Sequence, residues 1–367
     1  MSQAAEPRVT LPSKPHAAPL GAIAWVRANL FNSIPNALLT LVAIVIAAKL
    51  IPPFIRWAVI DATWSAANGQ ECRKGGGACW AFIGEWFRFI LFGRFPYEEQ
   101  WRPLLVIVIF VFMFVASCNR RLWGQALVAI WVIGAALVLA LMFGGFLGMT
   151  YVETALWNGL PLTLILAVFG TQVAFILAVP LALGRRSKMP AVRALCVAYI
   201  ELVRGVPLIT VLFMASVMLP LFLPSGATID KLLRAQIAII LFAAAYLAEI
   251  VRGGLQALPK GQYEAADALG LGYWRKMRLV IIPQALAMVI PPLVNTFIGT
   301  FKDTSLVIII GVFDLLTTAT TSLSDANWRG FYWEAYIFVG LIYWCFCFFM
   351  SKYSQYLERD LNKGRRR

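Results

Sequence analysis

Two short stretches of the chain repeat one arrangement of opposite charges. Glu201 and Arg204 are three residues apart, and Glu249 and Arg252 repeat that spacing. Residues three apart share one face of a helix, where opposite charges attract. At the end of a membrane-spanning bundle such pairs can form a gate that opens when helices move. Alternatively, the arginines anchor the helix ends in lipid headgroups. Charges within spans tend to face the bundle interior, which favours the gate.

A second set of polar residues lies within or beside long apolar segments. A path for zwitterionic solutes needs such groups, with cations for the carboxylate and anions for the ammonium group. For any single member the alternative is hydrogen bonding between neighbouring helices, which is common for Asn, Ser and Thr in membranes. Taken together the set favours a solute path, and its members are Gln172, Thr210, Asn295, Lys302, Asp303, Thr304 and Ser305.

The sequence lacks the residue patterns of catalytic and metal sites. His16 is the one histidine, and the six cysteines are scattered apart from the close pair Cys72 and Cys79. The sequence also lacks the Gly-x-x-x-x-Gly-Lys-Ser/Thr pattern that cradles nucleotide phosphates. We therefore expect a chain that is not an enzyme and holds no metal or cofactor, so any ATP and Mg²⁺ would bind to other subunits.

The segments that carry these residues indicate an integral membrane protein. Of 367 residues, 60% are apolar and only 14% are charged, and the mean hydropathy is +0.76. Soluble domains are about a quarter charged, so this chain needs lipid around it. The formal charge of +14 would suggest a nucleic-acid partner in a soluble protein. Here basic cytoplasmic loops that meet anionic lipid explain it better, and we expect no nucleic acid.

Eight apolar runs approach the roughly 20 residues that a membrane-spanning helix needs. With eight spans, the short basic loops and both termini fall on one side, which predicts that both termini are cytoplasmic. The expected fold is an all-α polytopic membrane protein of about eight transmembrane helices. The predicted spans are 33–52, 102–118, 124–148, 157–183, 196–222, 233–252, 284–303 and 333–351.

The spans define four parts of the chain. They are a cytoplasmic tail 1–32, an N-terminal three-helix extension 33–150, a core 151–352, and a basic cytoplasmic C-terminus 353–367. The extension contains a long loop, 53–101, that we expect to face the periplasm. In that loop Cys72 and Cys79 flank three consecutive glycines, which make a tight closure sterically easy. An oxidising compartment would permit a disulfide between them, and the alternative is two unpaired thiols in a flexible loop.

The loop 253–283 lies between two spans on the cytoplasmic side. Its alanine-rich stretch is compatible with a helix, Gly270 and Gly272 are suitable stops, and a second helix can begin at Tyr273. We expect a helix-turn-helix that forms a compact knob able to fill a groove on another protein. The alternative is an ordinary amphipathic loop.

This loop resembles the EAA loop of ABC-importer permeases. The matching residues are Glu264, Ala265, Ala266, Gly270 and Pro283, while Val280 and Ile282 stand where Ile and Leu are usual. Four further stretches resemble hallmarks of polar amino acid permeases, at 199–208, 246–254, 258–262 and 301–306.

The resemblance implies a five-helix type I ABC importer permease core, preceded here by three helices as in the long permeases of general L-amino acid transporters. It also implies a second permease subunit, by preference a paralogue, two ATPase subunits coupled through 253–283, and a periplasmic amino acid-binding protein. The expected function is ATP-driven import of polar L-amino acids across the bacterial inner membrane. The alternative is a secondary transporter driven by an ion gradient, a class that usually shows paired halves with interrupted helices.

Overall fold

The computed structural model describes residues 21–224, 226 and 228–365. The first twenty residues of the predicted tail, including His16, and the last two residues of the basic C-terminus lie outside the described residues. Within the described part there is no strand, and two isolated bridges join Thr63 to Cys79 and Gly159 to Asp314. The prediction of an all-α protein is confirmed.

The helices vary from four to 34 residues in length. In chain order they are α1 (Ala22–Leu30), α2 (Ile34–Ile55), α3 (Gly69–Gly75), α4 (Trp80–Phe92), α5 (Trp101–Cys118), α6 (Gln125–Phe143), α7 (Gly159–Arg185), α8 (Pro190–Arg204), α9 (Leu208–Phe213), α10 (Lys231–Ala257), α11 (Lys260–Ala268), α12 (Tyr273–Lys276), α13 (Ile282–Met288), α14 (Ile290–Asp303), α15 (Leu315–Ser322) and α16 (Tyr332–Arg365). Short 3₁₀ or π segments extend several of them, including Arg56–Ile60, Met214–Met218, Leu219–Phe222, Met277–Ile281 and Thr304–Ile310.

Seven helical segments among the described residues are long and apolar enough to cross a membrane, and a bent pair raises this number to eight. They overlap the eight predicted spans and are Ile34–Ile60, Tyr97–Cys118, Gln125–Phe143, Gly159–Arg185, Lys231–Ala257, Ile290–Ile310 and Tyr332–Asp360, with the pair Pro190–Arg204 and Leu208–Phe222. The prediction of about eight transmembrane helices is therefore confirmed.

Two predicted spans differ from the structure in detail. The run 196–222 is not one straight helix, because α8 and the helix that follows meet at 104°. Pro207 adopts an extended conformation at this bend, and a residue that precedes proline is biased away from the helical region. The run 284–303 is interrupted at Val289, and α14 restarts with Pro291 in its first turn. Proline is tolerated there because the first amide groups of a helix have no partner within it.

The described chain divides into two compact units. The first comprises residues up to 62 together with 75–78, and the second comprises 63–74 and everything from 79 onward. In the first unit α2 has no buried residue, as expected for an apolar helix surrounded by lipid. A hydrogen bond of 2.8 Å from the Ala78 amide to the Trp57 carbonyl joins the π segment after α2 to residues 75–78.

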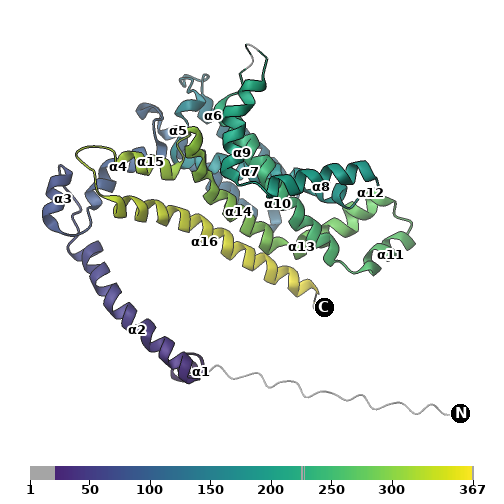
Figure 1. Cartoon of the computed structure of the whole chain (residues 1–367), viewed down its shortest axis with the longest axis horizontal. Helices are drawn as coiled ribbons and strands as arrows, with labels where there is room; N and C mark the ends of the chain where they lie inside the picture. The colour runs from purple at the N-terminus through teal and green to yellow at the C-terminus, as the bar shows by residue number, and fades with distance from the viewer. Residues whose placement is uncertain (1–20, 225, 227, 366–367) are drawn as a thin grey trace. The chain divides into compact units, whose positions relative to one another are not determined.

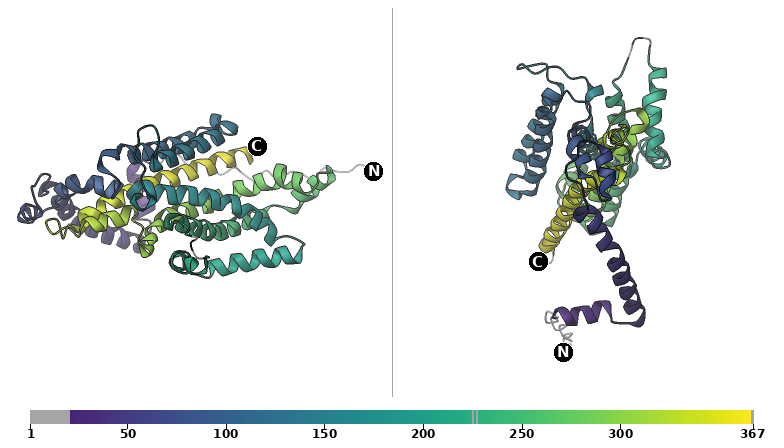
Figure 2. Two further views of the ribbon diagram at one scale, coloured as in Figure 1. Left: turned by 90° about the horizontal axis from the view of Figure 1, so that it is seen from above. Right: turned by 90° about the vertical axis from the view of Figure 1, so that its left-hand side faces the viewer.

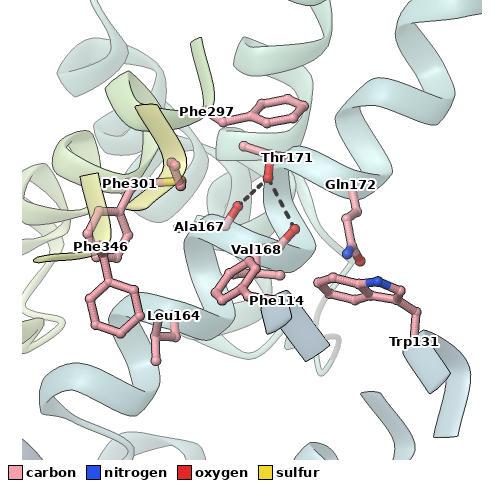
Figure 3. A pocket seen from close by; sticks show the side chains of 11 residues that line it. Phe114, Trp131, Leu164, Ala167, Val168, Thr171, Gln172, Phe297, Phe301 and Phe346 are labelled. Carbon is pink, nitrogen blue, oxygen red and sulfur yellow. Dashed lines mark hydrogen bonds between the residues drawn. The ribbon is translucent and has the colours of Figure 1, made fainter. Parts of the chain in front are cut away.

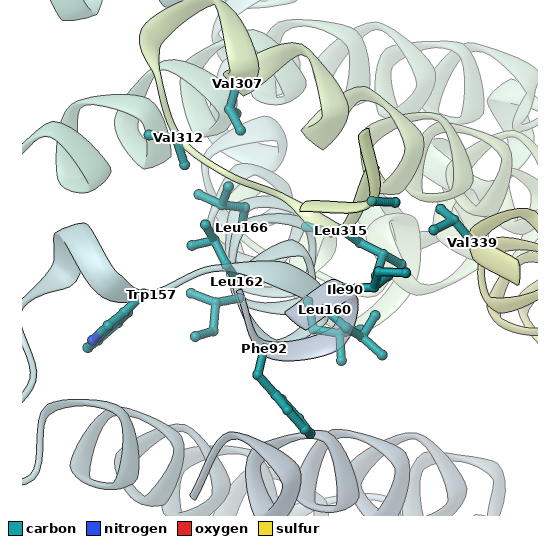
Figure 4. Close-up of a cluster of buried hydrophobic side chains, with 14 of the residues drawn as sticks. Ile90, Phe92, Trp157, Leu160, Leu162, Leu166, Val307, Val312, Leu315 and Val339 are labelled. Atoms are coloured by element: carbon teal, nitrogen blue, oxygen red, sulfur yellow. The ribbon is translucent and has the colours of Figure 1, made fainter. Parts of the chain in front are cut away.

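The core of the second unit is built around α7. This helix packs along α10, and buried alanines on α10, such as Ala244 and Ala248, allow close approach of the two backbones. Figure 4 shows leucines of α7 among side chains from α4, from α16 and from the segment around Val312. Residues far apart in sequence thus share one apolar cluster.

The second unit has two ends of different composition. Figures 1 and 2 show α4 and α15 at one end and α11 and α12 at the other. We call the first the disulfide end, comprising α3, α4 and α15, and the second the knob end, comprising α11 and α12. The helix α16 starts at the disulfide end beside α4 and α15, and it runs beside α14 (Figure 1).

A buried arginine joins α5 to the C-terminal end of α6. The side chain of Arg102 is 0% exposed. Its guanidinium donates to the carbonyls of Leu141 at 2.6 Å, Thr150 at 2.9 Å and Met142 at 3.3 Å, and Glu99 lies 3.4 Å away. The last carbonyls of a helix have no partner within it. Arg102 supplies partners to these carbonyls, and they in turn compensate for its buried charge.

Candidate functional site

The loop 253–283 folds into a helix, a turn and a second helix at the knob end (Figure 1). The helix α11 ends where Gly270 adopts a φ of +69°. This left-handed conformation strongly favours glycine. Gly272 then caps α12, which continues through a π segment into α13. The predicted helix, break and second helix are confirmed.

The five residues expected to couple to ATPase subunits occupy different environments. Glu264, Ala265 and Gly270 are exposed, whereas Ala266 is only 2% exposed. Pro283 is an exposed residue in the first turn of α13. One side of α11 is therefore anchored through Ala266, and the other is accessible to another protein.

A few polar contacts hold the knob to the rest of the unit. Within the knob, Lys276 Nζ lies 2.5 Å from Asp267 Oδ1 and joins α12 to α11. Tyr263 donates its hydroxyl to the Leu255 carbonyl of α10 at 3.0 Å. The Gln284 amide of α13 donates to Gln262 Oε1 at 3.0 Å. These bonds fix the orientation of α11 relative to α10 and α13.

Large apolar side chains of the turn and of the helical segment after it are exposed. Leu269 is 79% exposed and Trp274 is 74% exposed, and Tyr273 and Leu279 are also exposed. The knob belongs to none of the candidate membrane spans, so lipid does not explain this exposure. Contiguous exposed apolar side chains mark protein interaction surfaces.

A charge cluster joins three helices close to the knob. Arg185, the last residue of α7, lies 2.7 Å from Glu201 of α8 and 3.6 Å from Glu249 of α10. Glu249 also pairs with Arg252 on the next turn of α10. Arg185 thus connects the two glutamates that the sequence repeat singled out.

Only one of the two expected charge pairs forms. Glu249 and Arg252 pair with each other, but Glu201 pairs with Arg185 rather than with Arg204. The guanidinium of Arg204 lies over the ring of Tyr246 at 5.6 Å from its centroid. Arg185 was not predicted as part of the gate, because it lies just beyond the predicted span 157–183. The signal that could have identified it is this position, directly after a long apolar run, where the helix continues to Arg185.

The knob contacts the residue that directly follows α7, next to this cluster. Arg186 Nη1 donates to the hydroxyl of Tyr263 at 3.3 Å, and Tyr263 belongs to α11. A movement of α11 would therefore act on Arg186, which directly follows Arg185 at the end of α7. This contact supplies a short physical connection between the knob and the charge cluster.

The residues expected along a solute path differ in exposure and in their contacts. Thr210, Asn295 and Lys302 are exposed, Asp303 and Ser305 are half-buried, and Thr304 is buried. The hydroxyls of Thr304 and Ser305 donate to the carbonyls of Phe301 and Lys302, both at 2.9 Å. Both hydroxyls therefore form hydrogen bonds within their own helical segment.

Gln172 is separate from the other members of the set. It lines a cavity of about 170 Å³ whose other walls are almost entirely apolar, including Trp131, Phe297 and Phe301. Figure 3 shows its amide beside the Trp131 indole, while Thr171 on the same helix donates to backbone carbonyls. This cavity does not have the polar lining expected of a zwitterion path.

At the disulfide end, Cys72 and Cys79 form a disulfide with their Cα atoms 5.5 Å apart. Both are buried. The Cys79 amide donates to Glu334 Oε1 of α16 at 2.7 Å, and Arg73 donates to the Arg329 carbonyl at 2.7 Å. The loop is therefore attached to the C-terminal part of the chain. In the described segments of the chain, no group of three or more His, Cys, Asp or Glu residues is placed to hold a metal ion.

Comparisons with known proteins relate this chain to transporter subunits. Residues 174–363 match the family described as binding-protein-dependent transport system inner membrane components. The inner membrane amino-acid ABC transporter permease protein YhdY of Escherichia coli (strain K12) is 53% identical over 350 residues, covering 94% of each chain. The glutamate/glutamine/aspartate/asparagine transport system permease protein BztC of Rhodobacter capsulatus is 39% identical over 415 residues, covering 95% of each. Among solved structures, a chain of an amino acid ABC transporter crystallised with histidines aligns with a TM-score of 0.49 at 34% identity, over 55% of this chain and 92% of that one. The family match and the two sequence relatives show that this multi-pass inner membrane protein belongs to the family of binding-protein-dependent transport system inner membrane components.

Proposed function

We propose that this chain is the permease subunit of an ATP-driven importer of polar L-amino acids. The observation that carries this proposal is the 53% identity over 94% of the chain to an amino-acid ABC transporter permease. A second relative that matches 95% of the chain is named for transport of glutamate, glutamine, aspartate and asparagine. Because these matches span nearly the full length, the proposal concerns the whole chain.

Separate ATPase subunits would bind ATP and Mg²⁺ and dock on the knob. Support comes from the apolar side chains that the knob exposes, above all Leu269 and Trp274. In protein interfaces such anchors supply most of the binding energy. Glu264, Ala265 and Gly270, which are also exposed, would border this contact. The knob would then transmit ATP-driven movement to α7 and α10.

The remaining partners would be a second permease subunit, by preference a paralogue, and a periplasmic amino acid-binding protein. The exposed positions of Asn295 and Lys302 on α14 favour a solute path completed by the second subunit. In this arrangement both termini and the knob face the cytoplasm, consistent with the basic short loops. The disulfide end then faces the periplasm, where disulfides persist.

The charge cluster would act as the cytoplasmic gate. Arg185 holds α7, α8 and α10 together through Glu201 and Glu249. Partly buried pairs are screened less than exposed ones, so separating the helices has an energetic cost. ATP-driven movement of the knob would offset that cost.

The test is co-purification and reconstitution of the chain with its native partners. We expect an ATPase to co-purify, and its hydrolysis in proteoliposomes to rise when a binding protein loaded with a polar amino acid is added. Uptake should require ATP and persist when ionophores collapse ion gradients. Uptake that needs a gradient but no ATP would refute the proposal and support a secondary transporter.

A further inference from the structure

A cavity of about 170 Å³ with both polar and apolar lining residues lies near the disulfide end of the second unit. Its lining comes from the extension, from the segment before α7, from the start of α10 and from the segment before α15, and its polar members include Arg94, Thr154, Asn158, Asp230 and Lys231. Roughly 10–15 Å³ of such volume admits one water molecule. The cavity therefore has room for several waters or for one small polar solute.

The exposed Arg94 contacts Asn158 and Phe313 at the edge of this cavity. Its backbone amide and its Nε donate to Asn158 Oδ1 at 3.3 and 3.4 Å, and its guanidinium lies 4.5 Å from the centroid of the Phe313 ring. Gly93 and Gly159 allow the two backbone segments to interlock. A Cβ atom at Gly93 would lie 2.2 Å from the Asn158 Cβ, and one at Gly159 would lie 2.1 Å from the Leu91 carbonyl oxygen. These close approaches fix the backbone segment that carries Arg94 against the segment that carries Asn158.

Two exposed cations at this cavity have donors that make no hydrogen bond to the described residues. The Nη1 and Nη2 atoms of Arg94 have no hydrogen-bond partner within the described segments. Lys231 makes no ion pair with any residue that the structure describes. Its Nζ lies 3.6 Å from the place that a Cβ of Gly311 would occupy. Both groups can therefore donate to an anion in the cavity.

One carboxylate completes the lining. Asp230 Oδ2 accepts from the Thr154 hydroxyl at 2.6 Å, and Oδ1 accepts from the Leu233 amide at 3.0 Å. An ionised carboxylate has about four acceptor positions, so Asp230 keeps capacity for a further donor. Arg94 and Lys231 thus give the lining two positive charges, and Asp230 gives it one negative charge.

We propose that this cavity is a binding site for a free amino acid in its zwitterionic form. Arg94 and Lys231 would bind the α-carboxylate, since charge-assisted hydrogen bonds to a carboxylate are stronger than neutral ones. Asp230 would accept from the α-ammonium group. This inference rests on the proposed function and adds an entry site on the side where the substrate arrives. It also assigns a role to the extension, because Arg94 lies outside the family match at 174–363.

The direct test measures binding to the purified full-length chain in lipid nanodiscs, without partner subunits. The probes are L-glutamine, L-glutamate and L-arginine, followed by saturation-transfer NMR and competition titrations. The wild-type chain should bind at least one probe. The matching N-acetyl derivative and the α-carboxamide should bind roughly tenfold more weakly or not at all, because each loses one charge contact worth about 1.5 kcal/mol or more.

Three variants and one control locate the site. Arg94→Gln and Lys231→Gln should weaken probe binding roughly tenfold. Asp230→Asn keeps an acceptor for the Leu233 amide and should weaken the amino acid but not its N-acetyl derivative. Arg88→Gln is the control, because Arg88 also belongs to the extension but stacks on Tyr97, outside this cavity. It should bind like wild type.

Several results would overturn the inference. These are no binding of any probe to the wild-type chain, equal binding by wild type and Arg94→Gln, or equal loss in the Arg88→Gln control. A weaker affinity for the binding protein with unchanged probe binding would instead assign Arg94 and Lys231 to protein docking. Uptake by the assembled transporter is scored separately. ATP-dependent uptake without a site on the isolated chain leaves the proposed function intact.

Discussion

The disulfide end and the knob end of the second unit are held together in different ways. At the disulfide end, loop, helix and C-terminal segment are joined by a covalent bond, by the Cys79 to Glu334 hydrogen bond and by backbone contacts that only glycine permits at Gly159. At the knob end a few side-chain hydrogen bonds and one ion pair hold α11 and α12, and large apolar side chains remain exposed.

This difference indicates which end depends on a partner. The disulfide end buries part of its aromatic side chains, such as Phe82 beside Trp328 and Phe331, although Phe87 of α4 is exposed. The knob end leaves Leu269 and Trp274 more exposed, and we propose that the ATPase subunits cover them. Mutations at the two ends should therefore affect different properties: docking and transport at the knob end, and folding stability at the disulfide end.

The largest expected effect is loss of transport on changing the knob. Gly270→Asp introduces a charge beside the exposed apolar side chains and should reduce uptake roughly tenfold or more, because an unpaired charge covered by a partner protein costs about 2 kcal/mol or more. The measurement is amino acid uptake, with membrane abundance of the chain as a check. Gly270→Asn is the matched control, since Asn is equally large, neutral and tolerant of left-handed φ. It should keep more uptake than Asp. Wild-type uptake by Gly270→Asp would contradict the docking assignment.

The next largest effect should be on stability, near the disulfide end. Arg102→Met removes the donors to the carbonyls of Leu141, Met142 and Thr150 and should destabilise the fold by about 3–5 kcal/mol, the range for breaking a buried charged contact. Thermal unfolding of the purified chain measures this loss. Arg121→Met, at an exposed arginine, should change stability by less than about 0.5 kcal/mol. Equal unfolding of both variants would show that Arg102 is not structural.

A smaller effect is expected from removing the disulfide. The double variant Cys72→Ser, Cys79→Ser should insert normally and lose roughly 2–3 kcal/mol of local stability by the loop-closure relation. Proteolysis of loop 53–101 should become faster, whereas ATPase co-purification should not change. Intact mass after alkylation without reductant gives the thiol state of the wild-type chain. Two alkylated thiols at these positions in native membranes would refute the disulfide and its assigned side.

The smallest effect should come from the charge cluster. Partly exposed ion pairs contribute about 0.2–1 kcal/mol. Arg185→Gln should therefore raise basal ATP hydrolysis without binding protein by up to about fivefold, since 1.4 kcal/mol is tenfold. Arg193→Gln on α8, an exposed arginine, is the control. If hydrolysis and uptake are both unchanged in Arg185→Gln, the cluster anchors helix ends and does not gate.

Local features of this fold could be predicted from sequence. Apolar runs located the spans, and Gly270 and Gly272 located the break between α11 and α12, because hydrophobicity and backbone freedom are properties of neighbouring residues. The bend between α8 and α9 could have been anticipated from Pro207, which restricts the residue before it. It was missed because the apolar run continues across the proline.

Contacts between residues far apart in the sequence could not be predicted from it. Arg185 pairs with a glutamate 16 positions away on another helix, and Arg102 bonds to a carbonyl 39 positions away. Neither pairing follows from local spacing. Likewise, the residues predicted along the solute path all lie within or beside apolar runs of the sequence. In the structure, Gln172 lines an apolar cavity, whereas Asn295 is exposed. Which of them face one another depends on the rotation of each helix about its axis, which the sequence does not specify.

The length of α16 has a mechanical consequence. At 34 residues the helix is about 50 Å long, well beyond the roughly 30 Å of bilayer hydrocarbon. Glu334 fastens its first turn to the disulfide loop, and Asp360 near its other end pairs with Arg120 at 2.5 Å. Because the helix is long, a small tilt at its first turn becomes a larger displacement at its other end. A tilt of about 5° at the first turn would displace the far end by about 4 Å over this length, enough to separate Arg120 from Asp360.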